Sequence, residues 1–237
     1  MKAIFALLLI TYNIHYTTCS FFDPLRRVHG TAPSPPVLDL RQSKRVFSPV
    51  DQKQCNLCFV SSALTAFEYW SGTPLSLQYT LDCSREKGTS PCKRGGDVNH
   101  VMAWAQTHGI PLEVSNPADV TSDGLCPTTM PSTVFFQLHE YGSESDVSST
   151  RLQELLWRYG PVITNMNVDT EAKELTCTKN SIHHSIAVVG YTEQYFIIKN
   201  SWGSSWKDKG YDILPRGSHS CGFARRVWYV KMASLRT

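Results

Sequence analysis

The sequence predicts an α+β protein with two lobes and a cleft between them. Between residues 58 and 159, three segments repeat apolar side chains at helical spacing. After residue 184, four short segments are rich in β-branched and aromatic residues and are separated by turn signals. A helical half followed by a stranded half is typical of α+β architecture, and 237 residues are enough for two small lobes around a shared cleft.

The first helix is expected to begin at Cys58 and to stop at Gly72. Its apolar stripe consists of Phe59, Ala63, Phe67 and Trp70. A second helix is expected from Val98 to His108, because Gly109 follows it as a stop signal.

The third helix is expected from Thr150 to Tyr159. Thr150 and Gln153 fit the spacing of a capping box, and Gly160 with Pro161 ends the helix. Beyond it the apolar period changes to that of strands. The strands are expected at 185–191, 195–200, 210–214 and 226–230.

The first residues fit an export signal. Met1 and Lys2 give a basic start, residues 3–11 are apolar, and small residues precede a cut after Cys19. We therefore expect a signal peptide at 1–19 and a short leader at 20–36, with Arg26-Arg27 as a site for trimming. No later segment is apolar enough to span a bilayer, so no membrane attachment is expected after signal cleavage.

The cysteine count predicts a free thiol. Eight cysteines are present, and removing Cys19 with the signal leaves seven. In an oxidising compartment six would pair, which leaves one unpaired and open to reaction. Six cysteines allow 15 pairings, so the count alone does not identify the free one.

The composition excludes several function classes. The net charge is +3 and 18% of residues are charged, without a basic run, so no nucleic-acid partner is expected. A metal site at His183 and His184 is disfavoured because the spacing typical of structural zinc is missing. A redox pair at Cys55 and Cys58 is disfavoured because no βαβ context surrounds it. We expect neither a metal nor a cofactor.

Cys58, His184 and Asn200 are the candidate catalytic residues. A thiol becomes nucleophilic as thiolate, which an imidazolium and the positive end of a helix both favour. Cys58 begins the first expected helix, His184 opens an apolar strand, and Asn200 ends the next strand. An amide there can hold the imidazole in one tautomer.

Five segments in this order resemble the papain and cathepsin family of cysteine peptidases. They are DQKQCNLCF (51–59), LSLQYTLDCS (75–84), PCKRGG (91–96), HHSIAVVGY (183–191) and KNSWGSSW (199–206). The resemblance covers about residues 36 to 231. It implies a papain-like domain at 37–231 and a tail at 232–237. The helical lobe would span about 52–143, and an antiparallel, barrel-like β lobe would span 144–231 plus 37–51.

The resemblance also implies roles for other residues. The Gln52 side chain and the backbone N–H of Cys58 would form an oxyanion hole, and Trp202 would shield the contact between His184 and Asn200. Substrate would contact Gly95, Gly96, Asn165, Ile182 and Arg226. The implied disulfides are Cys55–Cys92, Cys83–Cys126 and Cys177–Cys221, which leaves Cys58 free.

The implied function is that of an endopeptidase acting through a Cys58 thioester, with His184 as general base and then acid. Its partners would be a peptide or protein substrate and a protein inhibitor, and the protein would be a monomer that is secreted or held in a lysosome or vacuole. Two alternatives remain: a catalytically silent binding protein, and an acyl-transferring or deamidating relative.

Departures from the family pattern add further expectations. Phe59 replaces a Trp, and Leu57 replaces a small residue and would narrow the cleft floor. Only residues 20–36 stand where relatives carry a long helical prodomain. Arg226, at the base of a substrate pocket, would favour an acidic residue at the second substrate position. Alternatively Arg226 faces solvent or pairs within the chain, or the alignment slips and Arg225 takes its place.

Overall fold

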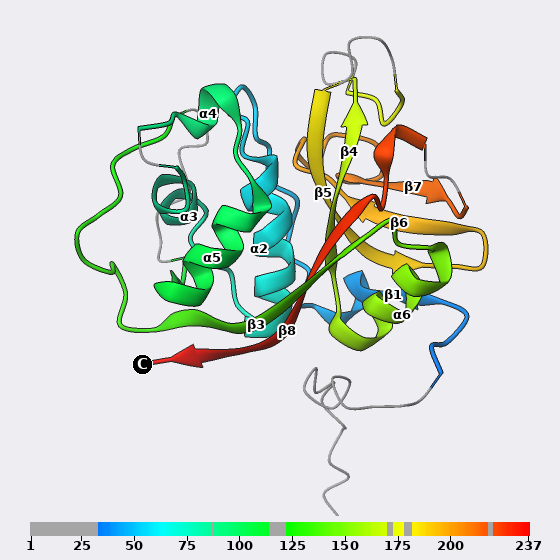
Figure 1. The fold of residues 1–237 in the computed structure, drawn as a ribbon, viewed down its shortest axis with the longest axis horizontal. Helices are drawn as coiled ribbons and strands as arrows, with labels where there is room; N and C mark the ends of the chain where they lie inside the picture. The colour runs from blue at the N-terminus through cyan, green and yellow to red at the C-terminus, as the bar shows by residue number, and fades with distance from the viewer. Residues whose placement is uncertain (1–32, 87, 114–121, 170–172, 178–181, 218–219) are drawn as a thin grey trace, which may run out of the picture.

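The structure is a computed structural model that describes residues 33–86, 88–113, 122–169, 173–177, 182–217 and 220–237. The expected signal peptide and the leader up to residue 32 lie outside the described residues. In the described part, most helices gather on one side, and most of an antiparallel sheet lies on the other side with the helix Ser149–Tyr159 packed against it (Figure 1), which confirms the predicted α+β class. No helix in these ranges is both long and apolar enough to cross a bilayer.

The helical side is built around α2, which runs from Cys58 to Ser71 as the sequence predicts. It ends at Gly72, whose φ of 72° lies in the left-handed region that glycine tolerates. Around α2 lie α3 (Leu77–Cys83), α4 (Pro91–Arg94) and α5 (Val98–Thr107). Figure 1 shows α2 between these helices and the sheet, and α2 contacts both β5 and β8, whose bounds are given below.

Helix α6 (Ser149–Tyr159) begins before the expected position. Its N-cap is Ser148, whose Oγ accepts a hydrogen bond from Arg151 N at 3.1 Å, so the capping box expected at Thr150 and Gln153 is wrong. Gln153 instead donates to Ser34 Oγ at 3.0 Å and to the Pro35 carbonyl at 3.2 Å. The last residues of the expected leader therefore contact the β lobe.

The described strands form one antiparallel sheet in the order β2-β3-β8-β4-β5-β6-β7, with β1 paired to β5. Their bounds are β1 Leu38–Asp39, β2 Ile110–Pro111, β3 Phe135–Ser145, β4 Val162–Val168, β5 Ile182–Tyr191, β6 Tyr195–Lys199, β7 Tyr211–Pro215 and β8 Arg226–Arg236. A short 3-10 turn, η1 (Leu40–Ser43), follows β1, and another, η2 (Ser220–Gly222), precedes β8. Strands β5 to β8 match the expected segments, whereas β1 to β4 were not predicted.

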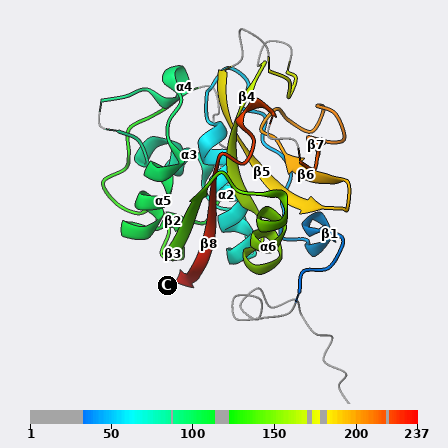
Figure 2. The same cartoon turned by 45° about the vertical axis from the view of Figure 1, so that its right-hand side comes forward.

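Strands β3 and β8 form a ribbon that belongs to both lobes. They pair from Phe135 with Arg236 to Ser145 with Arg226, and Figure 2 shows them side by side in front of α2. The expected lobe boundary at 143/144 therefore falls inside β3. The expected tail at 232–237 is part of β8 up to Arg236.

The two lobes share one hydrophobic core, which includes side chains from α2, α5, α6 and most strands. Two indole groups also link the lobes. Trp70 Nε1 on α2 donates to the Tyr159 carbonyl at 3.0 Å, and Trp228 Nε1 on β8 donates to Asn99 Oδ1 at 2.8 Å. These two hydrogen bonds and the shared core fix the position of one lobe relative to the other.

Candidate active site

Cys58 lies at the first residue of α2, where free backbone N–H groups and the helix dipole favour negative charge. The N-cap residue, Leu57, supplies no side-chain cap. The Leu57 side chain is fully buried in the core, so it does not narrow the cleft floor as expected. Among the described cysteines, Cys58 is the one that forms no disulfide.

The Cys58 thiol and the His184 imidazole lie close enough that each shifts the pKa of the other. Burial by itself raises the pKa of Cys58, but the His184 charge and hydrogen bond, together with the backbone N–H groups of Ser185 and Phe59, outweigh it and lower that pKa. Burial likewise lowers the pKa of His184, yet Cys58 and Asn200 raise it overall. The arrangement favours a thiolate–imidazolium pair.

Asn200 fixes the orientation of the imidazole. His184 Nε2 lies 2.8 Å from Asn200 Oδ1, and Ser201 N donates to the same oxygen at 2.8 Å. Since a carbonyl oxygen only accepts, Nε2 carries the proton and Nδ1 is left for Cys58. Asn200 Nδ2 is buried without a hydrogen-bond partner among the described residues.

Trp202 covers the contact between His184 and Asn200. Its ring stacks on the imidazole with centroids 5.0 Å apart, and Trp206 packs edge-on against it at 5.1 Å. His184, Asn200 and Trp202 are each at most 3% exposed, so water is largely excluded from this hydrogen bond. An electrostatic contact is stronger in such a site than in water.

Gln52 is held next to this group by the segment that carries Asn200. Gln52 N donates to the Ser201 carbonyl at 2.8 Å, and Ser201 Oγ donates to Gln52 Oε1. Because Ser201 engages Oε1, the Nε2 amide group is the end of Gln52 left to donate to a substrate oxygen. Sequence analysis did not single out Ser201, although its position between Asn200 and Trp202 was a usable signal.

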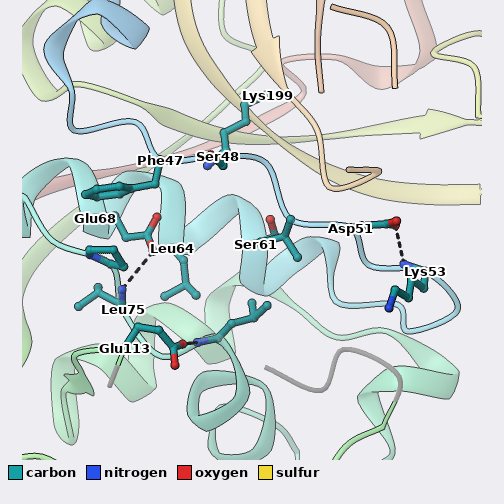
Figure 3. Close-up of a pocket in the computed structure, with 13 residues that line it drawn as sticks. Phe47, Ser48, Asp51, Lys53, Ser61, Leu64, Glu68, Leu75, Glu113 and Lys199 are labelled. Atoms are coloured by element: carbon teal, nitrogen blue, oxygen red, sulfur yellow. Dashed lines mark hydrogen bonds between the residues drawn. The ribbon is translucent and has the colours of Figure 1, made fainter. Parts of the chain in front are cut away.

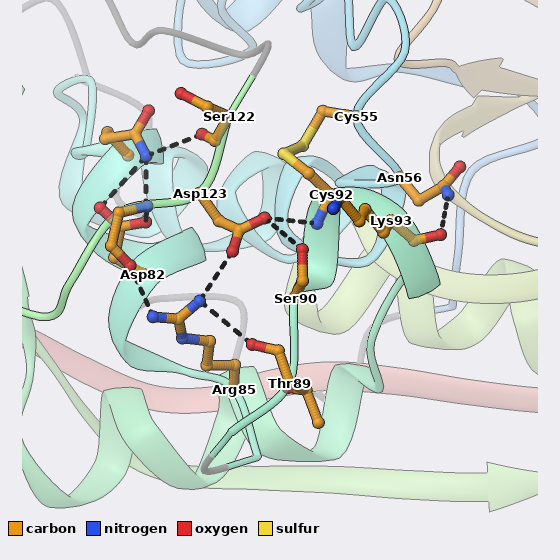
Figure 4. The surroundings of a disulfide bond; sticks show 12 residues. Cys55, Asn56, Asp82, Arg85, Thr89, Ser90, Cys92, Lys93, Ser122 and Asp123 are labelled. Atoms are coloured by element: carbon orange, nitrogen blue, oxygen red, sulfur yellow. Dashed lines mark hydrogen bonds and ion pairs between the residues drawn. A yellow bond between two sulfur atoms is a disulfide. The ribbon is translucent and has the colours of Figure 1, made fainter.

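Three disulfides join Cys55 to Cys92, Cys83 to Cys126 and Cys177 to Cys221, the pairs that the resemblance implies. The first ties the loop before α2 to α4. Figure 4 shows Asp123 bracing this region, because it accepts hydrogen bonds from Ser90 Oγ, Cys92 N and Arg85. The loop before α2, which contains Cys55, is therefore fixed to α4 by the disulfide and by the hydrogen bonds of Asp123.

Gly95 and Gly96 follow α4, where Gly95 lies against Asn56 and Gly96 against the buried Phe59 ring. A Cβ on Gly96 would lie 2.4 Å from the Phe59 ring, so only glycine fits there without a shift. Gly95 has a φ of 74° and ends α4 through its N–H to the Pro91 carbonyl. Glycine at position 96 therefore lets this segment pack directly on the Phe59 ring.

A hollow of about 360 Å³ lies between the lobes and contains Asn165 and Arg226. Asp97, Asn99, Met166, Asn167, His183, Cys221, Gly222, Arg225 and Trp228 complete its lining. Arg226 is exposed, and its guanidinium lies 5.4 Å from the centre of the Trp228 ring. Neither arginine has an ion-pair partner among the described residues. Ile182 pairs with Val168 in the sheet, and its side chain lies outside the description.

The structure thus gathers Cys58, His184, Asn200, Gln52 and Trp202 at one place. Asn165 and Arg226 line the hollow between the lobes, whereas Gly95 and Gly96 line a separate pocket next to α4. The polar residues Asp97 and Asn99 in the hollow were not predicted, because no spacing rule connects them with the catalytic motifs. Among the described residues, no group of His, Cys, Asp and Glu is arranged to hold a metal ion.

Cys58, His184 and Asn200 place a thiol, an imidazole and an amide together where a helical lobe meets an antiparallel sheet. This combination is typical of a two-lobed cysteine hydrolase. The chain belongs to the papain family of cysteine proteases, whose family model matches residues 34–231.

The curated relatives include mouse pro-cathepsin H, at 30% identity over 85% of this chain and 66% of the relative. A cathepsin L-like proteinase of Phaedon cochleariae is 30% identical over 84% of this chain and 66% of that protein. The chain therefore spans just under two thirds of the length of these relatives.

The solved structures agree on the fold. Digestive procathepsin L 3 of Tenebrio molitor larval midgut matches with a TM-score of 0.74 and 26% identity, over 86% of this chain and 72% of the other. The Carica candamarcensis cysteine protease CMS1MS2, solved in complex with E-64, matches with a TM-score of 0.69 and 24% identity, over 83% of this chain and 98% of the other.

Proposed function

We propose that this protein is an endopeptidase that cleaves peptide bonds through a thioester on Cys58. The observation that supports this most directly is the Cys58–His184 pair at the start of α2, where the pKa of the thiol is lowered and that of the imidazole is raised. A structural cysteine buried among apolar side chains would instead have a raised pKa.

In the proposed reaction, the Cys58 thiolate attacks the carbonyl carbon of the scissile bond. Gln52 Nε2 and the Cys58 N–H donate to the oxyanion that forms, where a single donor typically contributes 10²–10³ in rate, on the order of 3 kcal/mol. The C–N bond then breaks, and the leaving amine takes the proton of the His184 imidazolium. Water, deprotonated by His184, hydrolyses the thioester and restores the thiol.

The proposed partners are peptide or protein substrates and an inhibitor that occupies the same cleft. The relative crystallised with E-64 supports an inhibitor site of this kind. Three disulfides support an exported protein, secreted or held in a lysosome or vacuole. A monomer remains the proposed state.

Substitution of the nucleophile tests this function. Cys58→Ser should lower kcat on fluorogenic peptides by at least about 10⁴-fold, since a hydroxyl is not ionised near neutral pH. Its thermal unfolding should match the wild type, which excludes misfolding as the cause. Iodoacetamide should label Cys58 in the wild-type protein, as read by mass mapping.

The outcomes separate the alternatives. Unlabelled Cys58 and no cleavage would show a silent binding protein. A labelled Cys58 with transfer or deamidation but no hydrolysis would show the acyl-transferring relative. Wild-type peptidase rates in the Cys58→Ser protein would contradict the nucleophile assignment.

We further propose that the hollow between the lobes favours an acidic side chain at the second substrate position. Arg225 and Arg226 both line it without an ion-pair partner among the described residues, so a shift of one residue in the alignment does not remove the positive charge. Asp97 on the opposite wall offsets part of this charge. Arg226 is exposed, so its contribution is expected to be modest.

Matched peptides with Glu, Leu or Arg at that position test the preference. Arg226→Ala should lower the ratio of kcat/KM for Glu to that for Leu about two- to fivefold. Arg236→Ala, on an exposed residue at the far end of β8, should leave the ratio unchanged. The proposal fails if Glu is the poorest of the three substrates, or if Arg226→Ala does not alter the ratio.

A further inference from the structure

A second hollow, of about 670 Å³, lies where residues 47–53 pass over α2 (Figure 3). None of its lining residues is one of the proposed catalytic or substrate-binding residues. Its wall is mostly apolar, with Val50, Leu64, Leu75 and Leu77 among the lining side chains. It also contains a lysine, Lys199, from the end of β6.

Lys199 is the unusual member of this pocket. It is only 4% exposed, and its ammonium group has no hydrogen bond or ion pair with any described residue. An ammonium carries three N–H donors, and none of those of Lys199 is bonded to a described residue. Burial lowers the pKa of Lys199, and the charge of Glu68 offsets part of this effect. A ligand that accepts hydrogen bonds would satisfy this group.

Glu68 interacts electrostatically with Lys199, but neither Glu68 nor Glu113 forms an ion pair with it. Burial raises the pKa of Glu68 to about 7, so Glu68 is largely protonated at acidic pH, and it lies too far from Lys199 for an ion pair. Glu68 accepts from Leu75 N at 3.1 Å, and Glu113, whose pKa burial also raises, accepts from Leu77 N at 3.3 Å.

The rim of the pocket adds no net charge. Asp51 and Lys53 are both exposed there and carry opposite charges, which offset each other. The interior therefore presents the Lys199 cation, the carboxyl groups of Glu68 and Glu113, and apolar walls. At mildly acidic pH the Glu68 carboxyl group, whose pKa is about 7, is protonated and can donate a hydrogen bond. This combination fits an anion that carries an apolar body.

We propose that this pocket binds a small apolar carboxylate. Its carboxylate would accept hydrogen bonds from the Lys199 ammonium and from the Glu68 carboxyl group, and its apolar body would lie against Val50, Leu64 and Leu75. The ligand would contact both lobes, since Lys199 belongs to β6 and Glu68 to α2.

Calorimetric titration of the purified protein at mildly acidic pH with 3-phenylpropanoate tests the proposal. A 1:1 complex with a dissociation constant of about 1 mM or tighter is expected for a ligand of this size. The neutral analogue 3-phenylpropanamide and the cation 3-phenylpropylamine should each bind at least about tenfold more weakly, because neither offers Lys199 a negative charge.

Two variants locate the site. Lys199→Met, which keeps the apolar stem, should weaken binding of 3-phenylpropanoate at least about tenfold. Lys93→Met, on an exposed lysine outside the pocket, should not change it. Val50→Trp should abolish binding by filling the pocket while Lys199 is retained, and it decides the question if Lys199→Met does not fold.

Several results would overturn the proposal. They are undetectable binding of 3-phenylpropanoate, equal or tighter binding of the amide or the amine, and unchanged affinity in folded Lys199→Met or Val50→Trp protein.

Discussion

The thiol of Cys58 and the imidazole of His184 each depend on the other for their charge. The thiolate survives as pH falls until the lowered pKa of Cys58 is reached, and the imidazolium survives as pH rises until the raised pKa of His184 is reached. The charged pair therefore exists between these two pKa values. Below this window the thiol is protonated, and above it the imidazole no longer has a proton to give.

This dependence predicts the pH profile of Cys58 alkylation. In the wild-type protein, iodoacetamide should react rapidly at mildly acidic pH, far below the ordinary thiol pKa of 9.0. His184→Ala removes the charge and the hydrogen bond but leaves much of the burial, so the pKa of Cys58 should rise and the rate near pH 6 should fall at least about tenfold. Mass mapping of the labelled cysteine gives the rates.

His183→Ala is the matched control, because His183 is exposed and adjacent in sequence. Its alkylation profile should follow the wild type. A wild-type rate that rises only above pH 8, or an unchanged profile in His184→Ala, would contradict the pairing.

The sequence alone could single out Cys58, His184 and Asn200 as candidates, because each stands at the end of a segment with a clear apolar period, and the structure places the three together. The position of Ser201 next to Asn200 was a signal in the sequence, but no local pattern shows that Ser201 bonds to Gln52, which lies 149 positions away. Nor could the sequence place Lys199 in the second hollow, because the walls of that hollow come from α2, from residues 47–53 and from the segment around Leu75.

Among the elements, α6 shows how a cap decides where a helix begins. Ser148 and Thr150 are both good capping residues, and Gln153 gives the Thr150 position the more complete motif. The structure uses Ser148, because Gln153 is engaged with Ser34 and Pro35 instead. A contact with a distant part of the chain therefore overrides the local signal.

The two capping residues give a paired prediction for stability. Ser148→Ala should lower the free energy of unfolding by about 1 kcal/mol, because Arg151 N loses its acceptor. Thr150→Ala, on an exposed residue inside the helix, should change it by less than about 0.5 kcal/mol. Urea unfolding of both variants measures the difference, and a larger loss in Thr150→Ala would show that the helix begins later.

Strands β3 and β4 were not predicted because neither shows the regular alternation of apolar and polar residues that marks a strand. In β3 the alternation of Phe136 and Leu138 breaks at bulges between Leu138, Glu140 and Tyr141. In β4 most residues are buried on both faces, so no alternation marks it. Both strands are recognised by their hydrogen-bonded pairing with neighbouring strands and not by the apolar pattern of their own sequence.

Across the whole molecule, the lobes are joined too closely to behave as independent units. One core passes through both, and the Trp70 and Trp228 indoles bond across the boundary. The β3–β8 ribbon also runs through both lobes. Cooperative unfolding is the expected result of such shared packing.

We therefore predict a single thermal transition for the Cys58→Ser protein, in which self-cleavage is prevented and the disulfides remain intact. The calorimetric and van't Hoff enthalpies should agree, and tryptophan fluorescence should change together with circular dichroism. Two resolved transitions, with the helical and stranded signals lost at different temperatures, would contradict a shared core.

The position of β8 in the sheet also has a consequence during synthesis. Ribosomes deliver β8 after every other described element, yet it pairs with β3 on one side and β4 on the other. Until it emerges, β3 and β4 each present an unpaired edge to other nascent chains. Translation thus leaves the two halves of the sheet unjoined almost to the end, and we expect chaperone occupancy to be greatest just before residues 226–236 appear.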